Sequence, residues 1–309
     1  MRSNRPAELI IGSVQLGLAY GAANRTGKPD RQTALRLVRR AADAGVAGFD
    51  TARAYGDSED RLGEALKGFA IPTITKLSPL TELPPDASPE TVVAAVDSSI
   101  AKSLAALQRD QLDCLLLHRA VQLTAFDGAV WKRLEHHLAK GTVGSLGVSV
   151  QSPAEALAAL AHPKVRHLQL PFNVLDWRWA ETGAISAIRS KRSVTVHARS
   201  VFLQGILAAG DSQLWPRVEG VDALLLITWL NACASKFGRQ NAADFCLAYV
   251  RAQDWIDGVV IGMETEQQLD ANLLLSTRPP LALADCAAIE AARPRVPEQL
   301  LDPASWPPR

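Results

Sequence analysis

Four ionisable side chains follow short apolar runs of the sequence, each near the point where its run ends. Asp50 and Tyr55 lie in GFDTARAYGDSEDRLGEAL, a stretch that begins like a buried strand and continues like a helix. Lys76 ends the run TITK, and His118 comes directly after CLLL. Alone, such a residue usually contacts solvent or loop backbone. Side chains of these types act as acids and bases, and a buried cluster of them is costly unless paired, so it indicates a functional site.

Bringing these side chains together requires a fold in which the apolar runs end side by side. Longer segments with helical spacing separate the runs, and continuous apolar character is typical of parallel strands covered on both faces. Eight strand–helix units in about 250 residues predict a single (β/α)8 TIM barrel, in which the carboxyl ends of all strands meet at one mouth. The predicted strands are ELIIGS, GFDTA, PTITKL, LDCLLLH, VGSLGVSV, VRHLQLPF, SVTVHA and IDGVVIG.

The segment 30–45 illustrates the helical pattern between strands. Its apolar residues recur on one face, arginines occupy the other, and Gly45 follows as a helix C-terminus requires. Ser88 and Ser152, each followed by proline, predict the N-termini of two further helices. The predicted buried face of the first helix consists of Ala34, Leu37, Val38, Ala41 and Ala42.

The main alternative fold is a doubly wound Rossmann sheet. That fold would carry a G-x-G-x-x-G turn after its first strand, and the sequence contains no such string. No linker or low-complexity tract divides the chain either. We therefore expect a single barrel domain over residues 1–309, with the Pro-rich C-terminal tail, residues 293–309, packed on the barrel.

Composition excludes several classes of partner. Of the 309 residues, 48% are hydrophobic and 21% are charged, and the net charge of +1 gives no bulk attraction to nucleic acid or membrane. The start lacks the apolar core of a signal peptide, and no apolar run approaches the roughly 20 residues of a spanning helix. We expect a cytoplasmic protein, a monomer or weak dimer. Its separated cysteines predict buried thiols: Cys114, Cys233, Cys246 and Cys286.

The motifs together resemble those of the aldo-keto reductase family, over nearly the whole chain. FDTARAYGDSEDRLGEAL is similar to the family's Asp-Thr-Ala…Tyr-Gly…Ser-Glu…Leu-Gly signature, and TITKL and LLLH stand in the places of its Lys and His motifs. GSLGVSV is similar to its strand-5 signature, and VVIGMETEQQLDANL to its strand-8 cofactor segment. The stretch GSVQLGLAYGAANRTGKP matches more distantly. The order and spacing of the motifs are more specific than any one of them.

The resemblance implies an NAD(P)-dependent oxidoreductase that reduces an aldehyde or ketone, or oxidises the corresponding alcohol or sugar, without a metal. Hydride addition places negative charge on the carbonyl oxygen, so the site must supply a proton and positive potential. Tyr55 would be the acid, and a buried Lys76 ammonium would stabilise its phenolate. Asp50 would keep Lys76 charged. His118 would orient the carbonyl oxygen through a ring N–H.

By the same resemblance, residues at the later strand ends hold the cofactor. The alternative is a purely structural role, in which the polar side chain only hydrogen-bonds to loop backbone. That role suits Ser200 better than Gln169, which interrupts an apolar strand. The matching residues are Ser149 and Gln169 for the nicotinamide carboxamide, Ser200, Leu203 and Gly205 for the pyrophosphate, and Gly262, Gln268 and Asn272 for the adenosine.

Three positions depart from the family pattern. Val150 stands where Asn is common, and Arg199 replaces the aromatic residue that usually stacks on the nicotinamide. A guanidinium can stack, but its charge disfavours an oxidised ring, so Arg199 would favour the reduced cofactor. The strand-8 segment lacks the Lys-Ser…Arg set that grips a 2′-phosphate, and Glu264 could repel that phosphate. Channel-β-subunit members carry Gln, like Gln268, and bind NADP. NADP(H) is the expected cofactor and NAD(H) the alternative.

Arg53, Arg119 and Arg199 are all expected at the barrel mouth, which suggests a substrate with an anionic group. Alternatively, Arg53 pairs with Asp57 or Glu59 in its own loop, and Arg119 caps a helix or points to solvent.

Two other functions fit the same residues less well. One is a cofactor-binding accessory or regulatory barrel with little turnover. The other is a lyase or isomerase that forms a Schiff base on Lys76, which would leave the cofactor segments unexplained.

Overall fold

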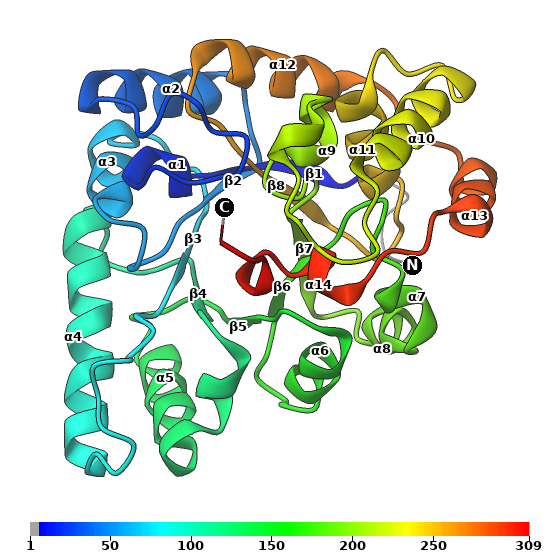
Figure 1. Ribbon diagram of the computed structural model, residues 1–309. Coiled ribbons are helices and arrows are strands. Elements are labelled where there is room, and N and C mark those ends of the chain that lie inside the picture. The colour runs from blue at the N-terminus through cyan, green and yellow to red at the C-terminus, as the bar shows by residue number, and fades with distance from the viewer. Residues whose placement is uncertain (1–5, 309) are drawn as a thin grey trace.

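Eight parallel strands pair in sequence order, and β8 closes the sheet onto β1. The computed structural model describes residues 6–308, and Figure 1 shows its strands at the centre with the helices around them. The predicted (β/α)8 barrel is confirmed. The strands are β1 (Glu8–Gly12), β2 (Gly48–Asp50), β3 (Thr73–Lys76), β4 (Cys114–Leu117), β5 (Leu146–Ser149), β6 (His167–Pro171), β7 (Thr195–Arg199) and β8 (Gly258–Gly262).

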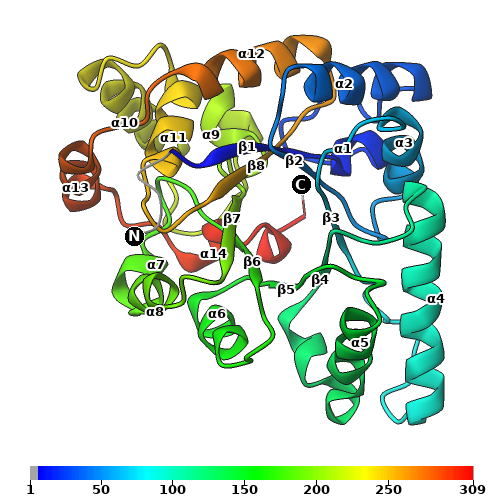
Figure 2. The ribbon, with the colours of Figure 1, turned by 180° about the vertical axis from the view of Figure 1, so that it is seen from behind.

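The helices form a ring on the outside of the barrel, as the view from behind also shows (Figure 2). Between β7 and β8 the chain adds several helices that the sequence pattern did not resolve. The α-helices are α1 (Val14–Gly17), α2 (Arg31–Asp43), α3 (Ser58–Ala65), α4 (Pro89–Leu107), α5 (Ala129–Ala139), α6 (Pro153–Leu160), α7 (Arg178–Glu181), α8 (Ala184–Ser190), α9 (Ile206–Ala209), α10 (Ala223–Lys236), α11 (Ala242–Arg251), α12 (Glu266–Thr277), α13 (Leu283–Ala292) and α14 (Glu298–Leu301). The 3-10 helices are η1 (Ala120–Leu123), η2 (Ala125–Gly128), η3 (Ser212–Leu214) and η4 (Pro303–Ser305).

Local sequence signals set the helix ends. Asp30 caps α2 by accepting a hydrogen bond from the Thr33 N–H. Ser88 and Ser152 cap α4 and α6 in the same way, and each is followed by proline, whose fixed φ suits the first helical position. The buried face of α2 is the predicted one: Ala34, Leu37, Val38, Ala41 and Ala42.

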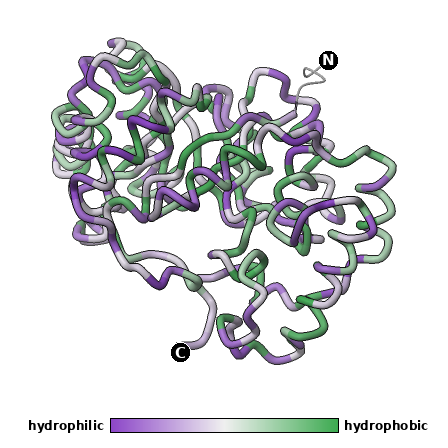
Figure 3. Tube along the Cα trace, turned by 90° about the horizontal axis from the view of Figure 1, so that it is seen from above, coloured by the Kyte–Doolittle hydropathy of each residue, from purple (hydrophilic) through white to green (hydrophobic). Residues whose placement is uncertain are grey.

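Most of the apolar core lies between the strands and the surrounding helices. Figure 3 shows hydrophobic colour along the central strands and alternating colour along the outer helices. The four cysteines are buried and unpaired, as predicted. No helix within residues 6–308 has the length and apolar character needed to cross a membrane.

The C-terminal tail crosses from α13 at the rim toward the centre of the barrel (Figures 1 and 2). Leu300 and Leu301 are buried, and the Trp177 indole donates to the Val296 carbonyl over 2.9 Å. At Asp302 the tail reaches the barrel mouth, because its Oδ1 accepts from the Gln151 side chain over 3.0 Å. The last residue of the predicted tail, Arg309, lies outside the described residues.

Two histidines fill the barrel interior. The rings of His167 on β6 and His197 on β7 meet edge to face with centroids 4.3 Å apart. Glycines on the neighbouring strands make room for them. A Cβ at Gly147 would lie 2.2 Å from the His167 carbonyl oxygen, and one at Gly258 would lie 2.8 Å from His197 Cδ2. Burial lowers the pKa of His197 to about 4 and holds that of His167 well below its ordinary value.

These lowered pKa values predict a loss of stability in mild acid. Above about pH 6.5 histidine is neutral in both the folded and the unfolded chain. Between about pH 6.5 and pH 4 the unfolded chain binds a proton at position 197 that the folded chain excludes. The free energy of unfolding should therefore fall as pH falls, by up to about 1.4 kcal/mol per pH unit for each such histidine.

Urea unfolding of wild type and His197→Leu between pH 7.5 and pH 5 tests this expectation. The variant should show a shallower loss of stability with acid, whatever its stability at neutral pH. Substitution of His162, which lies outside the barrel, should leave the wild-type slope. An unchanged slope in His197→Leu would contradict the assignment.

Candidate active site

The four ionisable residues predicted to cluster are brought together at the carboxyl end of the barrel. Asp50 is the last residue of β2, and Lys76 is the last residue of β3. His118 directly follows β4, and Tyr55 lies in the loop between β2 and α3. Neighbouring parallel strands end at the same level, which is why residues far apart in sequence meet here.

Asp50 and Lys76 form a buried ion pair. The Lys76 ammonium donates to Asp50 Oδ1 over 2.7 Å, to Oδ2 over 2.8 Å and to the Thr51 carbonyl over 2.9 Å. Lys76 is 1% exposed and Asp50 4%. Burial alone would lower the pKa of Lys76, but the adjacent Asp50 carboxylate outweighs it, so this pKa is raised. Three acceptor atoms surround the ammonium, so Lys76 is held in its protonated form.

Tyr55 and His118 lie beside this charge. The Lys76 ammonium is 5.1 Å from the centroid of the Tyr55 ring, and the Tyr55 and His118 rings meet edge to face with centroids 5.7 Å apart. Burial, followed by the positive charges of Lys76 and Arg199, lowers the pKa of His118 to about 3. The imidazole is therefore neutral and carries one N–H, and its Nδ1 is buried without a partner among the described residues.

Two glycines let the Tyr55 loop approach α1. A Cβ at Gly17 would lie 1.8 Å from the Tyr55 carbonyl oxygen. Gly56 has a φ of +57°, a left-handed conformation that favours glycine, and a Cβ there would lie 2.5 Å from the Gly17 carbonyl oxygen. The position of the phenol therefore depends on close backbone packing.

A cavity of about 740 Å³ opens at this end of the barrel. Asp50, Tyr55 and His118 line it, whereas Lys76 lies behind Asp50 and outside the lining. Of the predicted cofactor residues, Leu203 is buried in the core instead. The predicted cofactor residues that line the cavity are Ser149, Gln169, Arg199, Ser200, Gly205, Gly262, Gln268 and Asn272.

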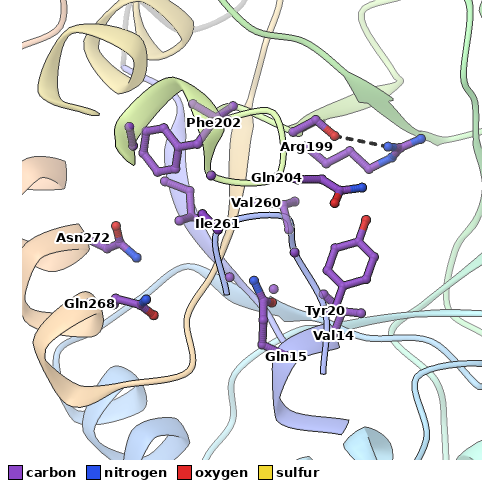
Figure 4. Close-up of a pocket in the computed structure, with 18 of the residues that line it drawn as sticks. Val14, Gln15, Tyr20, Arg199, Phe202, Gln204, Val260, Ile261, Gln268 and Asn272 are labelled. Carbon is purple, nitrogen blue, oxygen red and sulfur yellow. Dashed lines mark hydrogen bonds between the residues drawn. The ribbon is translucent and has the colours of Figure 1, made fainter. Parts of the chain in front are cut away.

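Figure 4 shows the two ends of this cavity. At one end Tyr20, Gln204 and Arg199 point toward one another, and at the other lie Gln268 and Asn272 of α12. A ligand that reached both ends would be elongated.

The loop after β7 has an unusual backbone. Ser200, Leu203 and Gln204 have φ values of 61°, 45° and 55°, and Gly205 has 91°. The loop packs on the segment after β1, where the Ala23 N–H donates to the Gln204 carbonyl over 3.2 Å. A left-handed backbone conformation costs free energy at residues other than glycine, and such strain is common at ligand-binding sites.

The α12 end of the cavity carries a carboxylate. Gln268 Nε2 donates to Glu264 Oε1 over 2.8 Å, and the Glu264 N–H donates back to Gln268 Oε1 over 2.8 Å. In the described part of the chain, no Lys or Arg forms an ion pair with Glu264, although it is buried and lines the cavity.

The three arginines expected at the mouth separate in the structure. Arg53 pairs with the fully buried Glu59 at 2.5 Å, as one alternative proposed. Arg119 is exposed at the start of η1, and its backbone N–H donates to Gln122 Oε1 over 3.0 Å. Neither lines the cavity. Only Arg199 does so.

Arg199 is held entirely by neutral acceptors. Its guanidinium donates to Gln151 Oε1 over 2.7 Å, to the Val150 carbonyl over 3.2 Å and to Ser200 Oγ over 3.3 Å. Gln151 in turn donates to Asp302 of the C-terminal tail. Among residues 6–308, no carboxylate pairs with Arg199 directly, so its positive charge remains available to the cavity.

The sequence prediction missed the contribution of the segment after β1. Gln15, Tyr20 and Asn24 line the cavity, and Gln15 Oε1 is buried without a partner in the described chain. A Cβ at Gly262 would lie 2.1 Å from this oxygen, so the glycine accommodates the Gln15 side chain. The only signal in the sequence was the distant match of GSVQLGLAYGAANRTGKP to a family segment.

Comparisons with known proteins agree with this architecture. The model of the Aldo/keto reductase family matches residues 8–294, so the chain belongs to that family of oxidoreductases acting on carbonyl groups. Among solved structures, the aldo-keto reductase AKR11C1 from Bacillus halodurans in its holo form has a TM-score of 0.75 and 22% identity, covering 96% of each chain. At this identity the likeness concerns the fold.

A curated relative covers less of the chain. The 6-dehydroglucose reductase of Novosphingobium aromaticivorans is 33% identical over 144 residues, 42% of this chain and 45% of the relative. The alignment thus spans less than half the length of either protein. Within residues 6–308, no group of three or more His, Cys, Asp or Glu residues is placed to hold a metal ion.

The buried ion pair leads to a prediction about stability. Lys76→Met leaves the Asp50 carboxylate buried without its cation, so the free energy of unfolding should fall by about 3–5 kcal/mol. In the double variant Lys76→Met, Asp50→Asn, a neutral amide replaces the unpaired carboxylate, so part of the lost stability should be recovered. Urea denaturation of the single and double variants measures both effects.

A surface pair supplies the control. Lys28 contacts Asp57 at 2.6 Å, but both side chains are more than a third exposed. Lys28→Met should therefore cost less than about 1 kcal/mol. A Lys76→Met variant as stable as wild type would show that Lys76 is not the buried partner of Asp50.

Proposed function

We propose that this protein reduces the carbonyl group of an aldehyde or ketone with a nicotinamide dinucleotide. The observation that carries the proposal is the buried ammonium of Lys76, held by Asp50 and placed 5.1 Å from the Tyr55 ring at the wall of the cavity. When bound, the cofactor would supply the hydride. The protein must then provide a proton and stabilise the negative charge that develops on oxygen.

Each side chain has one task in this reaction. Tyr55 donates its hydroxyl proton to the carbonyl oxygen, and the Lys76 ammonium stabilises the phenolate that remains. Asp50 keeps Lys76 charged in its buried position. Neutral His118 donates its single ring N–H to the carbonyl oxygen and so fixes the direction of attack.

The cavity residues fit a nicotinamide dinucleotide. Gln15 and Gln169 both line the cavity, and within residues 6–308 the Oε1 atom of each is buried without a hydrogen-bond partner. N–H donors of a ligand are the groups that would satisfy such acceptors. Ser149 and Gln169 would hold the carboxamide, with Arg199 against the ring. The backbone of the Ser200–Gly205 loop would follow the pyrophosphate. Leu203 would act there only through its backbone, because its side chain is buried.

Gly262, Gln268 and Asn272 would hold the adenosine. The family resemblance favours NADP(H). The Glu264 carboxylate at this end, which accepts from Gln268 and has no Lys or Arg partner within residues 6–308, favours the free ribose hydroxyls of NAD(H). Parallel titration of the two reduced cofactors decides between them, and Glu264→Gln should improve the affinity for NADPH relative to NADH.

The substrate class we propose is an oxidised sugar or a related small carbonyl compound. The partial similarity to 6-dehydroglucose reductase supports a sugar. Arg199, which has no carboxylate partner within the described chain and lies near His118 and Tyr20, supports an anionic substituent on that substrate. A partly desolvated guanidinium binds carboxylate or phosphate through two parallel hydrogen bonds.

The alternative of a Schiff-base enzyme is weakened by the geometry. Such an enzyme needs a neutral lysine amine, whereas the pKa of Lys76 is raised and the ammonium donates three hydrogen bonds.

Tyr55→Phe tests the catalytic assignment. It removes only the hydroxyl, so kcat for carbonyl reduction should fall at least about 100-fold while the dissociation constant of the reduced cofactor stays the same. Tyr20→Phe, at the other phenol of the cavity, should cost far less. Near-normal reduction by Tyr55→Phe would reject the assignment. Tight cofactor binding without turnover by the wild type, across a broad carbonyl panel, would favour an accessory barrel.

Variants of Arg199 and Arg119 test whether the substrate carries an anionic group or is neutral. An aldehyde that carries phosphate should exceed its neutral analogue in kcat/KM, and this advantage should shrink as salt rises. Arg199→Met should reduce the ratio of the two kcat/KM values. Arg119→Ala, an exposed arginine outside the cavity, is the matched control and should leave the ratio unchanged. A ratio near unity in wild type would mean that the substrate is neutral, and a wild-type ratio retained in Arg199→Met would mean that Arg199 does not contact the anionic group.

A further inference from the structure

Three hydroxyl groups form a buried hydrogen-bonded chain that ends on the main chain of Asp50. Ser13 lies between β1 and α1, Thr51 directly follows β2, and Ser58 is the first residue of α3. All three residues are 0% exposed. Thr51 Oγ1 is 3.1 Å from Ser58 Oγ, which is 2.7 Å from Ser13 Oγ. Ser13 Oγ is in turn 2.8 Å from the Asp50 carbonyl oxygen, so this hydroxyl chain joins three elements of the barrel.

The hydroxyl chain has a single direction, because each hydroxyl carries only one proton. The Asp50 carbonyl can only accept, so the Ser13 hydroxyl donates to it. Once that proton is used, Ser13 Oγ can only accept from Ser58, and Ser58 Oγ can only accept from Thr51. Every hydroxyl proton therefore has an acceptor. A buried polar network whose donors are all paired is rigid and holds one arrangement.

Tyr55 lies inside the loop that the hydroxyl chain closes. The bond between Thr51 and Ser58 joins residues on either side of Tyr55. Within this loop the Tyr55 N–H donates to the Ala52 carbonyl over 3.0 Å, and the Ser58 N–H donates to the Tyr55 carbonyl over 3.1 Å. The main chain of Tyr55 is thus held on both sides by a loop that is closed at its base.

The base of the loop is also the segment that holds Lys76. The Thr51 carbonyl accepts from the Lys76 ammonium over 2.9 Å, and the Asp50 carboxylate accepts from it over 2.7 Å. Residues 50 and 51 therefore contact the ammonium on one side and the hydroxyl chain on the other. The 5.1 Å between the ammonium and the centroid of the Tyr55 ring spans groups that are both anchored on this segment.

We propose that Ser13, Thr51 and Ser58 are positioning residues for proton transfer, because their hydroxyl chain holds Tyr55 in place relative to Lys76. This inference rests on the proposed function, since it takes Tyr55 as the acid. A displacement of about 1 Å at a reacting group can cost roughly 100-fold in rate. A loop released at its base should therefore slow the chemical step and leave the affinity for the reduced cofactor unchanged.

Two substitutions of Thr51 separate its hydroxyl from its shape. Thr51→Val keeps the branched shape and removes the hydroxyl, whereas Thr51→Ser keeps the hydroxyl and removes the methyl group. Single-turnover reduction, followed by the loss of absorbance of the reduced cofactor, measures the chemical step without product release. Thr51→Val should lower this rate at least about 10-fold, and Thr51→Ser should retain most of it. The dissociation constant of the reduced cofactor should stay the same in both.

The Tyr55→Phe background tests whether the hydroxyl chain acts through the acid. Without the phenol hydroxyl there is no proton donor to position. Thr51→Val and Ser58→Ala should therefore slow reduction strongly in wild type and only slightly in Tyr55→Phe, as is typical of residues that act as a unit. A purely structural role would lower both rates by the same factor.

A buried serine elsewhere supplies the matched control. Ser103 on α4 is 1% exposed and does not belong to the hydroxyl chain. Ser103→Ala should leave the rate unchanged in wild type and in Tyr55→Phe. Thermal unfolding establishes that each variant is folded at the assay temperature, and if Ser58→Ala is not, Thr51→Val decides.

The outcomes are distinct from those for the function itself. A wild-type rate in Thr51→Val would overturn the inference while leaving a reductase. An equal loss of rate in the wild-type and Tyr55→Phe backgrounds would do the same, because the hydroxyls would then act on the fold and not on the acid. Failure of wild type to reduce any carbonyl compound, or a wild-type rate in Tyr55→Phe, would instead overturn the proposed function.

Discussion

A lysine ammonium inside a barrel is stable only where a carboxylate and enough acceptors replace the water it has lost. Lys76 meets this condition through both oxygens of Asp50 and the carbonyl of Thr51. The charge then acts on everything near it. It contributes to the low pKa of His118 and reaches the Tyr55 ring from behind the cavity wall. The same carboxylate also accepts from Gln169, so one buried carboxylate orders Lys76 on one side and Gln169 on the other.

The barrel and the clustering of Asp50, Tyr55, Lys76 and His118 could be predicted from the sequence for a geometric reason. Parallel strands that close into a barrel end at a common level, so a polar residue at the end of each apolar run necessarily approaches the others. Helix caps were predictable because a cap is local: Asp30, for example, bonds to the residue three positions later. Both inferences depend on short stretches of sequence or on a rule of the fold.

Contacts that depend on side-chain direction were not predictable in the same way. Gln169 and Asp50 lie 119 positions apart and meet across the barrel interior, which no local pattern encodes. Arg53 and Arg119 follow strand ends, whereas Arg199 is the last residue of β7. Loop geometry turns Arg53 toward the buried Glu59 and leaves Arg119 exposed. The start of a strand–helix loop is fixed by the barrel, but the direction of a side chain several residues along is fixed by its packing partners.

Arg199 shows how the C-terminal tail takes part in the site without entering it. The Asp302 carboxylate does not contact the Arg199 guanidinium, because the Gln151 side chain lies between the two. The neutral Gln151 amide accepts from Arg199 and donates to Asp302, so it orients Arg199 without neutralising its charge. The guanidinium is thereby held in place while its positive potential stays in the cavity. A direct ion pair with the tail would have cancelled that potential. This arrangement is the structural basis of the anionic substrate that we propose.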